Sequence, residues 1–158
     1  MDKGVEFAAS TFDGKLGAVP GIKPSHDSIQ VLYIRKDWLD KLNLDDPKSH
    51  QDVLDIMQAF VEQDPDGNGV DDTYALGLSG DIWNTLYGAK GFAAAYGAFP
   101  SIWYANGDGG LVYGSVQPEM KDALGALRNL YEKNWLDPEF VVTNINETVV
   151  GGKGVAMA

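Results

Sequence analysis

Short apolar runs of strand length alternate along the chain with longer segments in which hydrophobic residues recur at helical spacing. The run IQVLYI at residues 29–34 is rich in β-branched side chains, and YALGLS at residues 74–79 has a similar length and character. Apolar runs of this kind predict strands buried in a sheet. A last strand is predicted at residues 154–158, after the pair Gly151-Gly152.

Two long helices have clear signals at their starts and along one face. Ser49 and Asp52 match a capping box, and Gln63 follows the last hydrophobic position of a helix whose apolar residues are Val53, Met57, Phe60 and Val61. Pro118 suits the first turn of a second helix, which Asn134 can end. Its predicted buried face consists of Met120, Leu124, Leu127, Leu130 and Tyr131.

Shorter elements fill the intervals. Helices are predicted at residues 37–42, with Trp38, Leu39 and Leu42 on one side, at residues 82–89 after a possible Asp81 cap, and at residues 146–150. Asp13-Gly14 predicts a turn followed by a short strand that Pro20 stops. A Gly-Asp-Gly-Gly turn between aromatic segments predicts a hairpin or long loop at residues 99–114.

This alternation of strands and helices predicts an α/β fold in two or three layers, with a mixed sheet flanked by helices. The 158 residues are enough for one compact domain with a sizeable core, and no internal repeat divides them. We therefore expect residues 1–158 to form a single α/β unit.

Charge and composition narrow the choice of partners. A net charge of −11 disfavours nucleic acid and acidic membranes, because both would be repelled. No stretch approaches the roughly 20 apolar residues of a membrane span, so direct membrane insertion is not expected. Cysteine is absent, which excludes disulfides, thiolate metal sites and a cysteine nucleophile. The numerous aromatic residues could supply planar surfaces for a ligand.

The acidic segment DPDGNGVDD at residues 64–72 has the spacing of a calcium-binding loop. Oxygen-bearing side chains occupy loop positions one, three, five and nine, Gly69 occupies the sixth, and the Val70 carbonyl can point inward. Calcium prefers about six to eight oxygen ligands, which alternate residues of a tight loop can supply. The predicted ligands of this structural calcium ion are Asp64, Asp66, Asn68, Val70 and Asp72.

The segment departs from a complete EF-hand, because position twelve is Ala75 and no EF-hand helix follows. It is therefore predicted to be an EF-like loop within another fold. The alternative is a solvated acidic turn, since Asp, Asn and Gly are common in ordinary turns.

Five segments occur in an order typical of one family. They are FDGKLGAVP, VLYIRKDWLDKLNL, DPDGNGVDDTYALGL, LRNLYEKNWLDPEF and GGKGVAMA. In these segments the chain resembles the bacterial extracellular solute-binding proteins of family 1, which include maltose-binding-like and lipoprotein-type oligosaccharide binders of ABC importers. Some members of this family carry a calcium site in a similar loop, although this chain has Thr73 where certain of them place a glutamate.

The resemblance implies a periplasmic-binding-protein-like (type II) fold, in which two lobes joined by crossing strands close on a ligand. FDGKLGAVP would then mark the first crossing and GGKGVAMA the return, so the chain is expected to be the second lobe alone. The parent protein is expected outside the cytoplasm, as a surface lipoprotein or in the periplasm. It would bind an oligosaccharide and deliver it to an ABC permease.

Sugar binding requires aromatic platforms beside carboxylates and amides. Three segments of this lobe are expected to face the cleft, namely residues 24–28, 81–84 and 103–106. The candidate ligand-binding residues are Asp27, Asp81, Trp83, Asn84, Trp103 and Tyr104. Each tryptophan could instead pack in the core, and Trp38 and Trp135 are assigned to the core.

Catalytic functions find less support in the sequence. Ser25, His26 and Asp27 are adjacent, so their side chains project apart and cannot form a catalytic triad. No motif selects a pair of carboxylates for glycoside hydrolysis. The chain is therefore predicted not to be an enzyme. The remaining alternative is a calcium-dependent structural or adhesion module that binds a protein or polymer.

Overall fold

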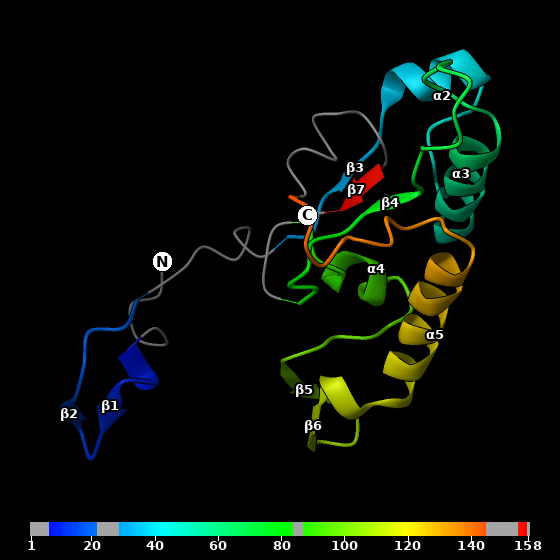
Figure 1. Cartoon of the computed structure of the whole chain (residues 1–158). Helices are drawn as coiled ribbons and strands as arrows, with labels where there is room; N and C mark the ends of the chain where they lie inside the picture. Colours follow the sequence, from blue (N-terminus) through cyan, green and yellow to red (C-terminus); the bar gives the residue numbers. More distant parts are fainter. Residues whose placement is uncertain (1–6, 22–28, 84–86, 145–154, 158) are drawn as a thin grey trace.

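The computed structural model describes residues 7–21, 29–83, 87–144 and 155–157. Among these residues the main sheet has three short strands, β3 (Leu32–Tyr33), β7 (Val155–Met157) and β4 (Leu76–Gly77), in the order β3-β7-β4. Strand β7 pairs antiparallel with β3 and parallel with β4. The predicted mixed sheet is thus confirmed, although it is small (Figure 1).

The strand predicted at residues 29–34 is shorter and more exposed than expected. Only Leu32–Tyr33 forms a strand, and Ile29, Val31 and Tyr33 are 64%, 46% and 55% exposed. The reason is that this strand lies at the edge of the sheet. Only alternate side chains, those of Leu32 and Ile34, pack against the helices there. Strand β4 does lie in the core, where Ala75, Leu76 and Leu78 are buried.

Two helices, α2 (Lys36–Leu42) and α3 (His50–Glu62), pack together beside the sheet. The predicted capping box is present, because Ser49 accepts a hydrogen bond from the backbone of Asp52, whose carboxylate accepts one from the backbone of Ser49. The contact between the helices is a buried cluster of four residues, Trp38, Leu39, Ile56 and Phe60. Both helices thus form where the sequence predicts them, and Trp38 is in the core as expected.

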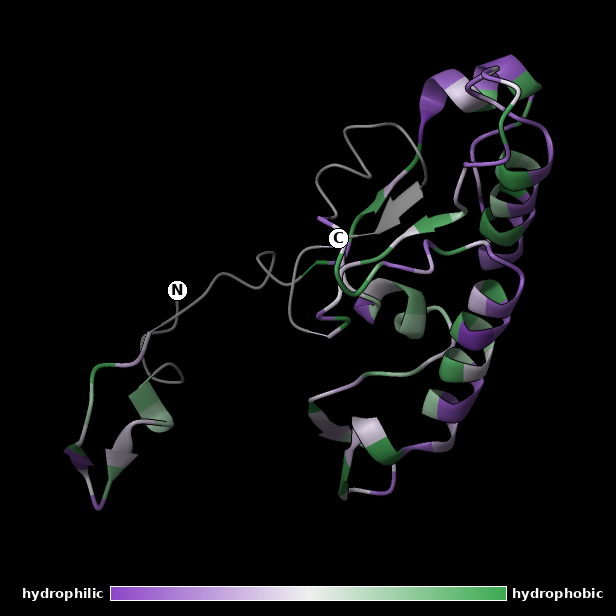
Figure 2. Ribbon diagram, in the orientation of Figure 1, coloured by the Kyte–Doolittle hydropathy of each residue, from purple (hydrophilic) through white to green (hydrophobic). Residues whose placement is uncertain are grey.

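Helix α5 (Pro118–Glu132) follows a single 3₁₀ turn, η2 (Gly114–Val116), and packs on α4 (Lys90–Ala94). Its predicted buried face is wrong at Leu124 and Tyr131, which are 45% and 46% exposed. The buried residues are Met120, Ala123, Leu127 and Leu130. Ala123 replaces Leu124 because a small side chain allows the close approach of Ala93 and Ala98. Figure 2 shows the resulting mixture of hydrophobic and hydrophilic positions along α3 and α5.

The helix predicted at residues 82–89 is not found in its described part. Ile82 and Trp83 form a turn, and Tyr87 has a φ of +62°. A residue in this left-handed conformation cannot continue a right-handed helix, and the next described helix is α4. The helix predicted at residues 146–150 lies outside the described residues. Asn134 ends the α5 segment as predicted, with a φ of +58°.

Two hairpins complete the described chain. Strands β1 (Thr11–Phe12) and β2 (Lys15–Leu16) are joined by Asp13-Gly14, and both turn residues have positive φ, as a tight hairpin turn requires. This hairpin lies away from the sheet and helices in Figure 1. Strands β5 (Trp103–Ala105) and β6 (Leu111–Tyr113) form the hairpin predicted at residues 99–114. Within the described ranges, no helix has the length and apolarity needed to cross a membrane.

Candidate functional site

An aromatic pair lies on the β5–β6 hairpin. Trp103 pairs directly with Tyr113 across the two strands, and their ring centroids are 5.3 Å apart with the planes tilted by 39°. Trp103 is 66% exposed. Leu111, two residues along β6 and 69% exposed, lies on the same face. The hairpin therefore presents a partly exposed apolar strip on one face, to which Trp103 contributes an accessible ring.

Tyr104 lies on the opposite face of the hairpin from Trp103, because successive side chains of a strand alternate. Its ring meets that of Phe99 edge to face at 5.6 Å, and it is only partly exposed. The two candidate ligand residues Trp103 and Tyr104 therefore lie on opposite faces of the hairpin. Tyr113 takes the place beside Trp103, and pairing across the Gly-Asp-Gly-Gly turn could have indicated it.

The other candidate ligand residues have different settings. Trp83 is partly buried and packs against two core clusters, whereas Asp81 is exposed and its carboxylate receives a long hydrogen bond of 3.4 Å from the Trp83 backbone. Trp135, assigned to the core, is half-buried with the Lys133 ammonium 4.7 Å from its ring centroid. Asp27 and Asn84 lie outside the described residues.

The acidic loop at residues 64–72 is organised around the Asp64 carboxylate. Its two oxygens accept hydrogen bonds from the backbone amides of Gly67, at 3.0 Å, and Gly69, at 2.9 Å. Asp64, Gly67 and Gly69 all have positive φ. A hydrogen bond shared with Asp66, followed by the Gly69 amide, lowers the pKa of Asp64. Asp64 is thus held as an anion at the inner side of the turn.

A second group of oxygens in the loop is connected by Asn68. Its amide nitrogen donates to Asp66 at 2.9 Å and to Asp72 at 3.1 Å, and its amide oxygen accepts from the Val70 backbone at 2.6 Å. The Val70 carbonyl accepts from the Asp72 backbone at 3.0 Å. The five predicted ligands are therefore close neighbours in one hydrogen-bonded turn.

The five predicted calcium ligands do not form a metal site in their present arrangement. In the described part of the chain, no three acidic, histidine or cysteine side chains converge as metal ligands would. Thr73, next to the loop, is 5% exposed, and its hydroxyl is buried without a hydrogen-bond partner among the described residues. It lines a hollow of about 430 Å³ together with Glu62, Asp64, Val70 and Asp71. The donor chemistry fits a hard cation, and the carboxylates would have to converge on one point to hold it.

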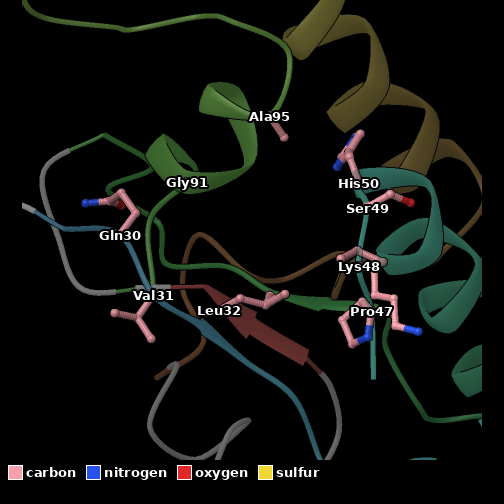
Figure 3. A pocket seen from close by; sticks show the side chains of 10 residues that line it. Gln30, Val31, Leu32, Pro47, Lys48, Ser49, His50, Gly91 and Ala95 are labelled. Carbon is pink, nitrogen blue, oxygen red and sulfur yellow. The ribbon is translucent and has the colours of Figure 1, made fainter. Parts of the chain in front are cut away.

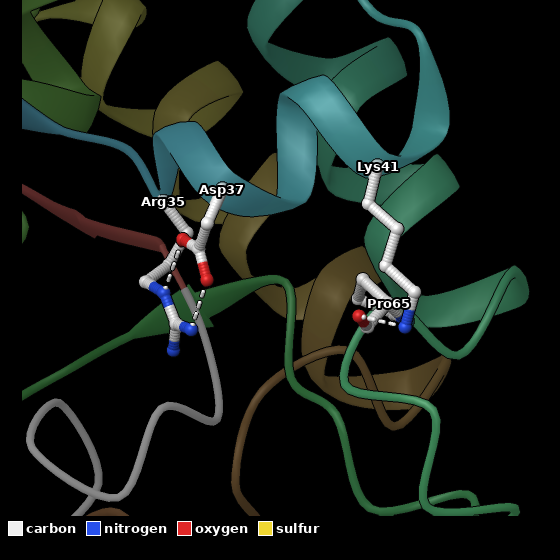
Figure 4. A network of polar contacts seen from close by, with 4 residues as sticks. All are labelled: Arg35, Asp37, Lys41 and Pro65. Carbon is white, nitrogen blue, oxygen red and sulfur yellow. Dashed lines mark hydrogen bonds and ion pairs between the residues drawn. The ribbon is translucent and has the colours of Figure 1, made fainter.

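Figure 4 shows two basic side chains of the α2 region, of which Lys41 contacts this loop. The Lys41 ammonium donates to the Pro65 carbonyl at 2.6 Å. The Arg35 guanidinium donates to Asp37 at 2.8 Å, and this bond is the main cause that raises the pKa of Arg35, with a smaller electrostatic contribution from Asp66. Lys41 thus places a positive charge against the loop on the side of α2.

A separate pocket of about 350 Å³ lies between β3, the start of α3 and α4 (Figure 3). Its lining includes Val31, Leu32, Pro47, His50 and Val53, and none of the predicted ligand-binding residues. His50 is the first residue of α3. In the structure its ring packs edge to face on Tyr96 and Phe92, and its Nε2 atom is buried without a partner among the described residues.

The environment of His50 leads to a prediction about pH. Burial lowers the pKa of His50 below its ordinary value of 6.5, so the folded state favours the neutral ring. The stability that the neutral His50 ring contributes is fully present above about pH 6.5. It falls as the pH drops below this value, because the unfolded chain then binds a proton more readily than the folded chain. Urea unfolding at pH 7.5 and pH 5 should show this loss, and His50→Gln should reduce the difference.

The matched control is His26→Gln, which replaces the other histidine of the chain. Asp52 and Asp64 do not interfere, because their pKa values are lowered from 3.8 and they titrate below this pH range. An equal loss of stability in wild type and His50→Gln would contradict the assignment.

Comparison with known proteins defines the class to which this chain corresponds. The chain is homologous, over about 85% of its length, to extracellular solute-binding proteins. It spans about a quarter of the length of the curated relatives it matches. These homologues are substrate-binding proteins, not enzymes. No profile of a known protein family matches the chain.

Two relatives come from Bacillus subtilis. The chain is 35% identical over 134 residues to the polygalacturonan/rhamnogalacturonan-binding protein YtcQ, covering 85% of this chain and 26% of that protein. It is 34% identical over 148 residues to the lipoprotein LipO, covering 87% of this chain and 28% of LipO.

A solved structure supports the same correspondence. The Streptococcus pneumoniae substrate-binding protein FusA, in complex with kestose, matches with a TM-score of 0.67 and 28% identity over 82% of this chain and 27% of FusA. An EF-hand mutant of FusA in complex with fructo-nystose matches with a TM-score of 0.69 and 27% identity, over the same share of each chain.

Proposed function

We propose that this chain is part of the substrate-binding component of an ABC importer and contributes to the capture of an oligosaccharide outside the cytoplasm. The observation that carries the proposal is the Trp103–Tyr113 pair, whose tryptophan ring is largely exposed on a hairpin. An exposed aromatic ring can stack on the flat C–H face of a sugar. Homology to YtcQ and FusA, one named for polygalacturonan and rhamnogalacturonan and the other for fructooligosaccharides, supports a carbohydrate ligand.

The proposed mechanism is binding without bond cleavage. Trp103 supplies the stacking surface, while Asp81, Trp83 and Tyr104 remain candidate ligand residues. The same holds for Asp27 and Asn84, which lie outside the described residues. The ligand would stabilise a closed arrangement of two lobes, which an ABC permease then recognises. The residues described here would contribute one side of that cleft.

Titration with oligosaccharides tests this proposal. We expect the chain by itself to bind oligogalacturonides or fructooligosaccharides weakly, with a Kd of about 1 mM or more, because it spans only part of the relatives' length. Trp103→Ala should abolish the calorimetric signal, whereas Trp135→Ala should leave it unchanged. Equal binding by wild type and Trp103→Ala would remove the hairpin from the site. Hydrolysis of any glycan would contradict the proposed class.

We also propose that the loop at residues 64–72 binds a structural calcium ion through Asp64, Asp66, Asn68, the Val70 carbonyl and Asp72. The oxygen spacing supports this site, as does the description of a similar protein, FusA, as having an EF-hand. The buried hydroxyl of Thr73 is a further oxygen beside the loop. Bound calcium would neutralise the mutual repulsion of four aspartates within nine residues.

Thermal unfolding in EDTA and in millimolar calcium measures this effect. Calcium is expected to raise the Tm of the wild type, because a ligand bound only by the folded state stabilises that state. Asp66→Ala should lose the increase, whereas Asp108→Ala, which removes an aspartate from the turn of the β5–β6 hairpin, should keep it. A Tm that is the same in EDTA and calcium would contradict calcium binding.

A further inference from the structure

Lys41 connects helix α2 to the start of the acidic loop. Its ammonium donates to the carbonyl of Pro65, the residue after Asp64, at 2.6 Å (Figure 4). The Pro65 side chain is fully buried. The hydrogen bond therefore joins an otherwise exposed lysine to a point of the loop that is already fixed by the core.

The same ammonium lies against the next part of the loop. A Cβ atom added at Gly67 would lie 2.8 Å from the Lys41 nitrogen, so a larger residue at this position would have to displace the ammonium. Gly67 has a φ of +75°, and its amide donates to the Asp64 carboxylate. Lys41 is thus in contact with the turn that surrounds Asp64, at both Pro65 and Gly67.

The base from which Lys41 reaches the loop is rigid. In α2, Trp38 and Leu39 are buried against Ile56 and Phe60 of α3, and the Trp38 and Phe60 ring centroids are 5.1 Å apart. Helix α3 ends at Glu62, two residues before Asp64. Packing thus fixes both the helix that carries Lys41 and the helix that leads into the loop.

We propose that Lys41 is a positioning residue of the acidic loop, which holds the turn from Asp64 to Gly69 in its folded shape before a cation binds. The Lys41 ammonium has two opposing effects on calcium binding. Its positive charge repels the ion, whereas a preformed turn lowers the cost of ordering the ligands. The geometry favours positioning, because the hydrogen bond of Lys41 goes to a backbone carbonyl while backbone amides hold the Asp64 carboxylate.

Amide hydrogen exchange in EDTA tests the positioning role without calcium. Lys41→Met keeps the apolar stem and removes the donor, so the Gly67 and Gly69 amides should exchange about tenfold faster or more, as local opening becomes easier. Lys36→Met is the matched control on the same helix, where Lys36 pairs with Asp40 and Asp46, and it should leave both amides unchanged. Lys41→Arg, which restores a donor, should recover most of the protection.

Unchanged exchange in Lys41→Met would overturn the proposal. If Lys41→Met does not fold, Lys41→Gln, whose shorter side chain should not reach Pro65, provides the same comparison.

Calcium titration adds a second measurement, which rests on the proposed calcium binding. Lys41→Met should weaken calcium binding by about threefold or more. Without Lys41 the turn must be ordered when calcium binds, and this ordering reduces the binding free energy. Tighter binding would show that charge repulsion dominates and would overturn the positioning role. If the wild type binds no calcium, the calcium proposal fails, and the exchange rates in EDTA still decide whether Lys41 positions the loop.

Discussion

Replacement of Phe60 by alanine is expected to lower the free energy of unfolding by about 3–5 kcal/mol, because it removes a large side chain from the contact between α2 and α3. Phe60 is completely buried, and its ring meets Trp38 edge to face. The cavity would be lined by residues of both helices and could close only if the helices moved. Urea unfolding followed by circular dichroism measures this loss.

Leu124→Ala on α5 is the matched control. Leu124 is 45% exposed, so its truncation removes less buried surface and leaves no closed cavity. Its cost should be about 1 kcal/mol or less. If Leu124→Ala were as destabilising as Phe60→Ala, the distribution of buried residues described here would be wrong.

Gly114→Ala is expected to destabilise the protein by about 3 kcal/mol and to disturb the hairpin that carries Trp103. Gly114 is buried, and a Cβ atom there would lie 1.8 Å from the backbone oxygen of Phe99. Backbone cannot move aside as a flexible side chain can. The strain would separate residue 114 from Ile102, whose carbonyl accepts the Gly114 amide hydrogen bond at 2.8 Å.

Gly125→Ala is expected to have the opposite effect on stability. Gly125 lies inside α5, and nothing lies within 4 Å of an added Cβ atom. Alanine should therefore stabilise the helix by about 0.5–1 kcal/mol. Urea unfolding of both variants, with near-ultraviolet circular dichroism of the aromatic residues, tests the pair. A stable Gly114→Ala with an unchanged aromatic signal would contradict the close approach.

Local patterns determined the elements whose signals are contained in neighbouring residues. The capping box at Ser49, the first turn at Pro118 and the turn at Asp13-Gly14 each depend on contacts within a few residues, and all three are confirmed. The order of five segments also indicated the solute-binding proteins, to which the chain is homologous. The spacing of the acidic loop predicted a compact turn, and its calcium ligation stays a prediction.

Only the tertiary structure decided which faces are buried and which aromatic residues are neighbours. Leu124 fits the helical period as well as Ala123 does, but packing against α4 selects the smaller residue. Tyr113 lies beside Trp103 because strand pairing brings together residues ten positions apart, while Tyr104, adjacent in sequence, points to the other face. The sequence by itself determined the local elements and the protein class. Which side chains are buried and which aromatic rings are neighbours depends on contacts between distant segments, which no local pattern specifies.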